Sequence, residues 1–212
     1  MAQSPRPPRT PASRSTSRLK IIALLGSFAV GALILVAAAT ALMPKAPQTG
    51  GTGVAAIGGP FTLVDQNGTA VTEASLKGKP TLIFFGFTHC PDVCPTALFE
   101  MSEIFTALGP DASKVQAYFV TVDPERDTPA VLKSYLGSFS PELKGLSGTP
   151  AQVDAMKRAY RVYSRKVPLD GGDYTMDHTA VIYLMDKTGT FLAPFNAKRP
   201  PAEAAADLRR VL

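Results

Sequence analysis

Three short apolar runs separated by helical patterns limit the folds open to this chain. Thr81 to Phe87, Val115 to Val122 and Ala180 to Met185 are almost unbroken in their apolar character, which is typical of strands covered on both faces. Between the first two, apolar residues recur every three or four positions from Leu98 to Leu108, and Gly109 ends the pattern. Strands that alternate with helices in this way predict a layered α/β domain.

The other predicted elements continue this alternation. Asn67-Gly68 separates two short strand-like runs and tolerates the backbone of a tight hairpin turn. Two Thr-Pro pairs begin helices, because proline is well tolerated at a first helical position. The predicted elements are hairpin strands 61–64 and 70–72, helices 128–139 and 149–163 joined by a short link, a strand 190–195 and a closing helix 200–212. Their order predicts a thioredoxin-like central sheet flanked by helices, with an N-terminal β-hairpin.

A segment ahead of this domain is long and apolar enough to span a membrane. Ile21 to Met43 contains no charged residue, and 23 residues at about 1.5 Å each exceed the roughly 30 Å hydrocarbon core of a bilayer. The basic residues that precede it place the N-terminus in the cytoplasm. We therefore expect a basic cytoplasmic tail 1–20, a single transmembrane helix 21–43, a flexible Gly- and Pro-rich linker 44–60 and a folded domain 61–212 on the periplasmic side of a bacterial-type inner membrane.

A cleaved signal peptide is the alternative reading of the same segment. Small residues from Ala37 to Ala41 offer cleavage sites of the A-x-A type. The uncleaved anchor is favoured, because a secretory apolar core usually runs only about 7 to 15 residues. Both readings export the domain.

The net charge of +5 does not indicate nucleic-acid binding, because the excess lies in the tail. Arg6, Arg9, Arg14, Arg18 and Lys20 fall in the first twenty residues, which contain no acidic residue. Subtracting these five from 22 basic residues leaves 17, against 17 acidic residues. The rest of the chain is formally neutral, so the sequence does not support a basic groove for nucleic acid.

Few residues could support thiol chemistry or bind a soft metal, since the chain has only two cysteines and two histidines. Cys90 and Cys94 lie between a buried strand and a helix, where the helix dipole favours thiolate over thiol. Their spacing is one residue longer than the C-x-x-C of thioredoxins. A purely structural disulfide is the alternative, but a link across so short a loop would add little stability. The location favours a redox-active or metal-binding pair.

His178 is the candidate third ligand, because it precedes the strand 180–185. If that strand runs antiparallel to the strand before Cys90, the histidine lies beside both sulfurs; otherwise it only caps a strand. Two thiolates and one imidazole suit copper, as Cu(I) or Cu(II), whereas structural zinc usually takes four protein ligands. His89 should point away from Cys90, and Met176 is more simply explained by packing.

The motif DPERDTP (123–129) follows the second apolar run, so it lies at the same edge of the predicted sheet as Cys90 and Cys94. Asp127 or Thr128 is explained as a cap for the helix that begins at Pro129. Asp123 has two readings, a structural carboxylate or an outer hydrogen-bond acceptor near the metal, and the structural reading is favoured.

Three segments in this order, FTHCPDVCP (87–95), VDPERDTP (122–129) and MDHTAVIYLMD (176–186), resemble the Sco/SenC/PrrC family of copper-binding cytochrome c oxidase assembly proteins. The resemblance implies a membrane-tethered thioredoxin-like domain with Cys90, Cys94 and His178 at the copper-ligand positions. It also implies as partner the copper-bearing subunit of cytochrome c oxidase, whose binuclear copper site family members load or whose cysteines they keep reduced. The resemblance covers residues 61 to about 197.

Two functions of different classes follow. A copper metallochaperone would bind one ion and pass it on by ligand exchange, with no turnover of a small substrate and with an upstream copper donor as a second partner. A thiol-disulfide oxidoreductase would use only Cys90 and Cys94 as its redox-active pair. A thiol peroxidase is less well supported, because it needs one activated cysteine and the second cysteine here does not argue for that activity.

Overall fold

The computed structural model describes residues 57–212. The predicted tail, the membrane segment 21–43 and the linker up to residue 56 lie outside the described residues. Within residues 57–212 no helix has both the length and the apolar character needed to cross a membrane.

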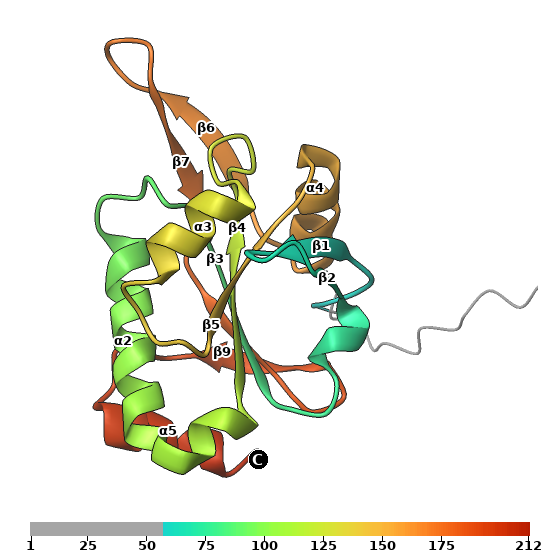
Figure 1. Ribbon diagram of the computed structural model, residues 1–212, viewed down its shortest axis with the longest axis vertical. Coiled ribbons are helices and arrows are strands. Elements are labelled where there is room, and N and C mark those ends of the chain that lie inside the picture. The colour runs from blue at the N-terminus through green and yellow to red at the C-terminus, as the bar shows by residue number, and fades with distance from the viewer. Residues whose placement is uncertain (1–56) are drawn as a thin grey trace, which may run out of the picture. The chain divides into compact units, whose positions relative to one another are not determined.

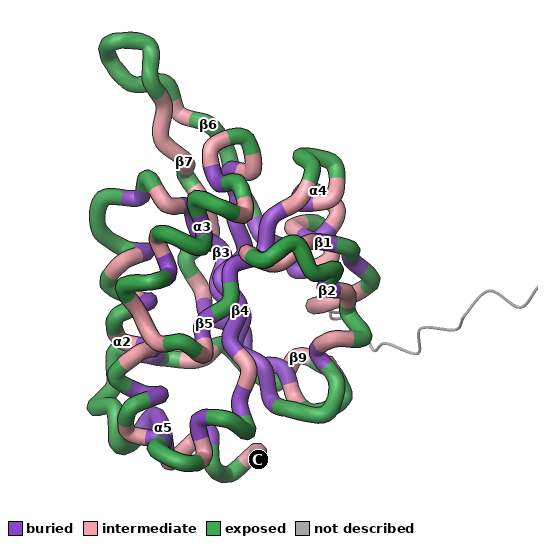
Figure 2. The backbone as a smooth tube through the Cα atoms, viewed as in Figure 1, coloured by how far each residue is buried: buried purple, intermediate pink, exposed green. Residues whose placement is uncertain are grey.

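A mixed sheet of seven strands forms the centre of the domain. The strands are β1 (Thr62–Asp65), β2 (Ala70–Thr72), β3 (Thr81–Gly86), β4 (Gln116–Thr121), β5 (Leu143–Ser147), β8 (Ile182–Met185) and β9 (Phe191–Phe195). They lie side by side in the order β2-β1-β5-β4-β3-β8-β9 (Figure 1). β3 is parallel to β4 and antiparallel to β8, as the thioredoxin-like prediction requires. Figure 2 shows these inner strands as largely buried.

Helices cover both faces of this sheet, which explains the unbroken apolar runs of β3 and β4. The helices are α2 (Val93–Leu108), α3 (Pro129–Leu136), α4 (Pro150–Ala159) and α5 (Pro201–Arg209), with short 3-10 turns at Glu73–Leu76 and Gly109–Lys114. On one face, the Phe119 ring of β4 packs against Tyr135 of α3, with centroids 5.9 Å apart. On the other, Phe85 of β3 packs at 5.7 Å against Tyr160, which follows α4. The predicted α/β fold, hairpin included, is confirmed.

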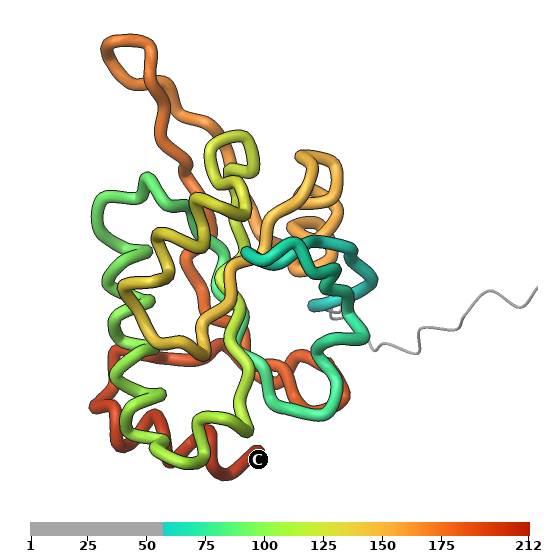
Figure 3. The backbone as a smooth tube through the Cα atoms, in the orientation of Figure 1, coloured from blue at the N-terminus to red at the C-terminus, as the bar shows by residue number. Residues whose placement is uncertain are grey.

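Three strands were not predicted. β5 occupies the segment that the sequence suggested was a short link, and it joins β1 to β4. A second hairpin, β6 (Ser164–Pro168) and β7 (Tyr174–His178), forms a separate two-stranded sheet where a loop was expected. Figure 3 traces this hairpin as it projects from the body of the domain.

Three helices end earlier than predicted. α3 stops at Leu136 instead of Phe139, α4 stops at Ala159 instead of Tyr163, and α5 stops at Arg209 instead of Leu212. In the second case the chain turns at Arg161, whose φ of 57° lies in the left-handed region that a helix does not use.

Buried phenols and a buried thiol make this fold sensitive to base. Burial raises the pKa of Tyr118, Tyr135, Tyr160, Tyr183 and Cys94 above their ordinary values of 10.0 for the phenols and 9.0 for the thiol. Because the folded state holds these protons more tightly than the unfolded state, their contribution to stability is complete only well below the ordinary thiol pKa of 9.0 and is lost as the pH rises. We expect the free energy of unfolding in urea to fall between about pH 8 and about pH 10.5; a constant value would contradict the burial of these groups.

Candidate metal centre

The turn between β3 and α2 places two sulfurs at the amino end of a helix. The amide of Cys90 donates to the carbonyl of Phe87 at 3.3 Å, which closes the turn after the strand. α2 then begins at Val93, so Cys94, which was expected ahead of the helix, lies in its first turn. The Cys94 amide donates to Cys90 Sγ at 3.4 Å. An N–H group in the first turn of α2, which has no acceptor within the helix, therefore faces Cys90 Sγ and would stabilise negative charge on this sulfur as a thiolate.

β7 brings the predicted third ligand to the same place. His178 is the last residue of this strand, and its Nε2 lies 3.7 Å from Cys94 Sγ. The ligand atoms of Cys90, Cys94 and His178 all lie within 4.8 Å of one another. The structure thus brings together the three side chains that the sequence analysis selected, although His178 ends a strand that was not expected.

Two contacts fix the orientation of the His178 ring. Its Nδ1 lies 3.0 Å from the carbonyl oxygen of Thr179, so a proton on Nδ1 is donated there. The ring also meets the face of Phe87 edge-on, with centroids 5.7 Å apart and an interplanar angle of 89°. This arrangement leaves the lone pair of Nε2 directed at the sulfurs, which is the tautomer that a metal ligand requires.

Both cysteines are free thiols and both are buried. Cys94 is fully covered, whereas Cys90 retains 8% of its surface. Burial raises the pKa of the Cys94 thiol well above its ordinary value of 9.0, because a buried thiolate without a cation lacks solvation. The less buried Cys90 is the sulfur that an approaching molecule would meet first.

Asp127 is a structural anchor for the cysteine loop instead of a helix cap. The cap of α3 is Thr128, whose hydroxyl accepts from the Val131 amide at 3.3 Å. The fully buried Asp127 carboxylate accepts from the amide and hydroxyl of Thr88, at 3.1 and 2.6 Å, and from the Thr121 hydroxyl at 2.7 Å. It therefore ties the segment before Cys90 to the end of β4.

Asp123 is also buried, but its hydrogen bonds lead away from the three ligands. It accepts from Arg126 Nε at 2.5 Å and from the Tyr174 hydroxyl at 2.9 Å. The structural reading of this residue therefore agrees with its contacts. His89 is exposed and hydrogen bonded to Thr88, and Met176 packs partly buried against the core, so neither joins the cluster.

Sequence reasoning missed Arg126, Tyr174 and Thr88 as residues around the site. Thr88 lies two residues before Cys90, and its place next to the end of β3 is a usable signal in the sequence. Arg126 and Tyr174 are 48 residues apart in the sequence, so no local sequence pattern predicts their contact.

Comparison with known proteins agrees with this geometry. The family model described as SCO1/SenC matches residues 49–212. The copper-bound structure of Bradyrhizobium japonicum ScoI is 68% identical and covers 74% of this chain and 100% of that chain, with a TM-score of 0.73. Copper-bound yeast Sco1 is 38% identical and covers 73% of this chain and 87% of that chain, with a TM-score of 0.67.

Curated relatives show the same similarity at the level of sequence. A SCO2-like protein of Rickettsia felis is 42% identical over 149 residues, which make up 69% of this chain and 73% of the relative. The mitochondrial SCO1 homolog 1 of Arabidopsis thaliana is 40% identical over 156 residues, or 73% of this chain, and the match spans only 46% of that relative's length. The resemblance found in the sequence motifs is confirmed, and the chain belongs to the SCO1/SenC family.

Proposed function

We propose that this chain binds one copper ion through Cys90 Sγ, Cys94 Sγ and His178 Nε2 and delivers it to the binuclear copper site of cytochrome c oxidase during assembly. The observation that carries the proposal is the convergence of these three ligand atoms within 4.8 Å. Similarity to the copper-bound ScoI and Sco1 structures supports the choice of metal. Delivery to the oxidase follows from what the family resemblance implies.

The donor set itself favours copper over other metals. Thiolate sulfur and imidazole nitrogen are soft or borderline ligands, and Cu(I) accepts sites of low coordination number. Within residues 57–212, the group contains no fourth Cys, His, Asp or Glu that would complete a structural zinc site. Cu(I) and Cu(II) both remain compatible with two thiolates and one imidazole.

Transfer by ligand exchange needs a partner to reach the ligands. Cys90 is the less buried of the two cysteines, and Val93, which lies between them in the sequence, is 49% exposed. A cleft of about 390 Å³ adjoins this turn and is lined by Asp92, Val93 and, from the segment after His178, Ala180 and Ile182. A copper-bearing oxidase subunit, or an upstream copper donor, would approach from this side. Attachment through a transmembrane helix 21–43, with the domain on the periplasmic side, would keep the site near a membrane-bound oxidase.

Thiol-disulfide exchange is a second candidate function, favoured by two free thiols whose sulfurs lie close together. Cys90 thiolate would attack a partner's disulfide, and Cys94 would then resolve the mixed disulfide. The partner gains two electrons and two protons as this chain forms its Cys90–Cys94 bond. The buried Cys94, whose pKa is raised, fits the resolving role better than the attacking one.

Copper binding by the reduced full-length chain, purified in detergent, separates the two functions. We expect one copper per chain with a thiolate-to-copper charge-transfer band. His178→Ala should weaken binding by roughly 100-fold or more and remove that band, since a ligand is lost. His89→Ala, which removes the exposed histidine, should behave like the unmodified chain.

Two results would contradict the proposed copper site or the proposed copper function. A His178→Ala variant that keeps copper and its spectrum would show that the assigned site is wrong. If the unmodified chain retains no copper while both thiols react with a thiol reagent, the oxidoreductase becomes the better account. His178→Ala should leave the redox cycling of the two cysteines intact in either case.

A further inference from the structure

The hairpin that carries His178 is not part of the main sheet. β6 and β7 pair only with each other, so no ladder of backbone hydrogen bonds fixes them against β3. Apart from the short link from His178 to β8, side-chain contacts therefore hold β7 at its distance from Cys94. Lys157 of α4 donates to Ser164 of β6 at 2.7 Å, and several further contacts involve one residue, Arg126, in the loop between β4 and α3.

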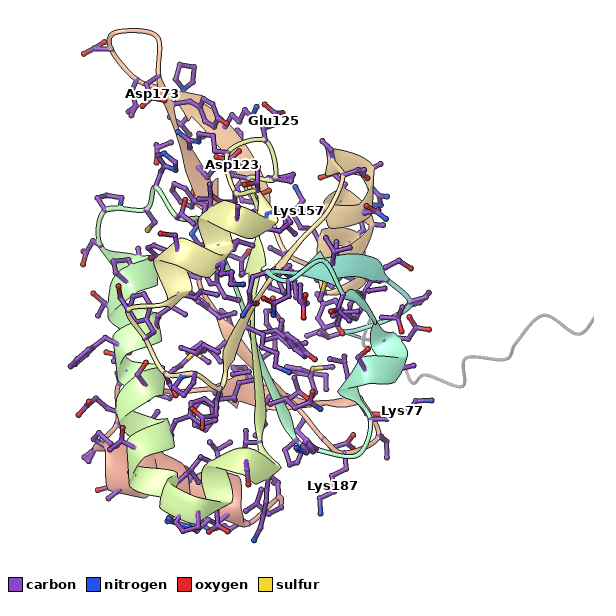
Figure 4. The ribbon with its side chains drawn as sticks, viewed as in Figure 1. Lys77, Asp123, Glu125, Lys157, Asp173 and Lys187 are labelled. Carbon is purple, nitrogen blue, oxygen red and sulfur yellow. The ribbon has the colours of Figure 1, made fainter. Side chains whose placement is uncertain are left out.

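Arg126 joins the body of the domain to the far end of β7. Its Nε donates to Asp123, and its Nη1 donates to the Tyr174 carbonyl at 2.9 Å and to Asp173 at 3.3 Å. Its guanidinium carbon lies 3.8 Å from the centroid of the Tyr174 ring. The Tyr174 hydroxyl in turn donates to Asp123 at 2.9 Å. Figure 4 shows Asp173 and Asp123 near the same end of the domain.

Burial separates this contact from the other ion pairs of the hairpin. The Asp123 side chain is fully covered and that of Arg126 is 17% exposed. By contrast, Lys166–Glu125 is 45% and 57% exposed, and Arg165–Asp177 is 65% and 57% exposed. Exposed pairs contribute little, whereas loss of one partner from a buried pair leaves an uncompensated charge. Among these ion pairs, Arg126 should therefore contribute most to the attachment of the hairpin.

The same residue is connected to the His178 ring through Phe87. The Arg126 guanidinium lies 6.0 Å from the centroid of the Phe87 ring. The same Phe87 ring makes a T-shaped contact with the His178 ring, with centroids 5.7 Å apart. Tyr174 and His178 are the two ends of the five-residue strand β7. Arg126 thus restrains one end of β7 directly and supports the aromatic ring that the other end packs against.

We propose that Arg126 is a positioning residue that, with Asp123 and Tyr174, holds the β6–β7 hairpin so that His178 Nε2 faces Cys90 and Cys94. Its importance for copper rests on the proposed function, but the position of the hairpin does not. Without Arg126 the two cysteines would remain in place, because the β3–α2 turn holds them independently, and the imidazole would be lost as a stable ligand.

Arg126→Met tests this inference, because methionine keeps much of the apolar stem beside Tyr174 and Phe87 but removes the charge and every donor. In the full-length copper-free chain, we expect amide hydrogen exchange across β7 to become at least 10-fold faster. Copper affinity should fall by about 10- to 100-fold, and the charge-transfer spectrum should approach that of His178→Ala.

Two further variants make the test specific. Arg165→Met is the matched control, since it removes an exposed arginine from the same hairpin, and it should change neither β7 exchange nor copper binding. Arg126→Lys keeps the positive charge beside Asp123 but lacks the planar fork that reaches Tyr174, so it should give an intermediate effect. It also serves if Arg126→Met does not fold.

The inference fails if Arg126→Met lowers only the melting temperature and leaves β7 exchange, copper affinity and spectrum unchanged. It also fails if Arg165→Met has an equal effect. Exchange in the copper-free chain decides the question even if the unmodified chain binds no copper, so a failure of the proposed function remains distinguishable from a failure of this one.

Discussion

Replacement of Asp127 by alanine is expected to lower the free energy of unfolding by about 2–4 kcal/mol. The change removes a fully buried carboxylate and leaves the Thr88 amide and the hydroxyls of Thr88 and Thr121 without their acceptor. The segment before Cys90 would also lose its tie to β4, so copper binding should weaken as well. Unfolding in urea, followed by circular dichroism, measures the first effect, and copper titration measures the second.

Two variants control this experiment. Asp127→Asn keeps an acceptor oxygen of the same shape and should cost less than the alanine variant. Asp154→Ala removes an acidic residue that is 51% exposed on α4, and its effect should stay within about 0.5 kcal/mol. If Asp127→Ala and Asp154→Ala unfolded at the same urea concentration, the Asp127 network would have no anchoring role.

Gly86→Ala is expected to destabilise the domain by about 1–3 kcal/mol and to disturb the metal centre at the same time. A Cβ atom at this last position of β3 would lie 2.5 Å from Phe119 Cε2 and 2.8 Å from Cys94 Sγ. Both distances are too short, so either the ring or the sulfur must move. Urea unfolding reports the stability, and the charge-transfer band of the copper-loaded chain reports the sulfur.

Gly145→Ala is the matched control for this steric effect. Its added Cβ would lie 2.9 Å from Leu136 and 3.0 Å from Leu132, both on α3 and away from the cysteines. A similar loss of stability is expected with no change in the copper spectrum. Equal disturbance of the spectrum by both variants would mean that Gly86 affects the centre only through general loosening of the fold.

The sequence was sufficient for the parts of the fold that are buried on both faces. β3, β4 and β8 are apolar runs because helices cover them, and the cysteine turn between β3 and α2 follows directly from the first of these runs. Cys90 and Cys94 could therefore be placed with little ambiguity. The expected antiparallel pairing of β3 and β8 then indicated that His178 should lie at the end of the sheet where the cysteines are.

The unpredicted strands lack that apolar signal for physical reasons. β5 reads LKGLS, and its Gly145 weakens a strand pattern because it makes room for α3 at close approach. β6 reads SRKVP and is partly to fully exposed, so no periodic apolar face marks it. Its position depends on Arg126 and Asp123, which are distant in sequence and become neighbours of Tyr174 only in the folded chain.

The burial of Cys94 has a consequence for when copper is held and when it is surrendered. Because the thiol keeps its proton far above neutral pH in the copper-free protein, loading at this sulfur must expel a proton into the surrounding solution. Acid and copper then compete for the same atom. The affinity of this site for copper should therefore fall as the pH falls, because each bound ion has to displace the Cys94 proton against a higher proton concentration.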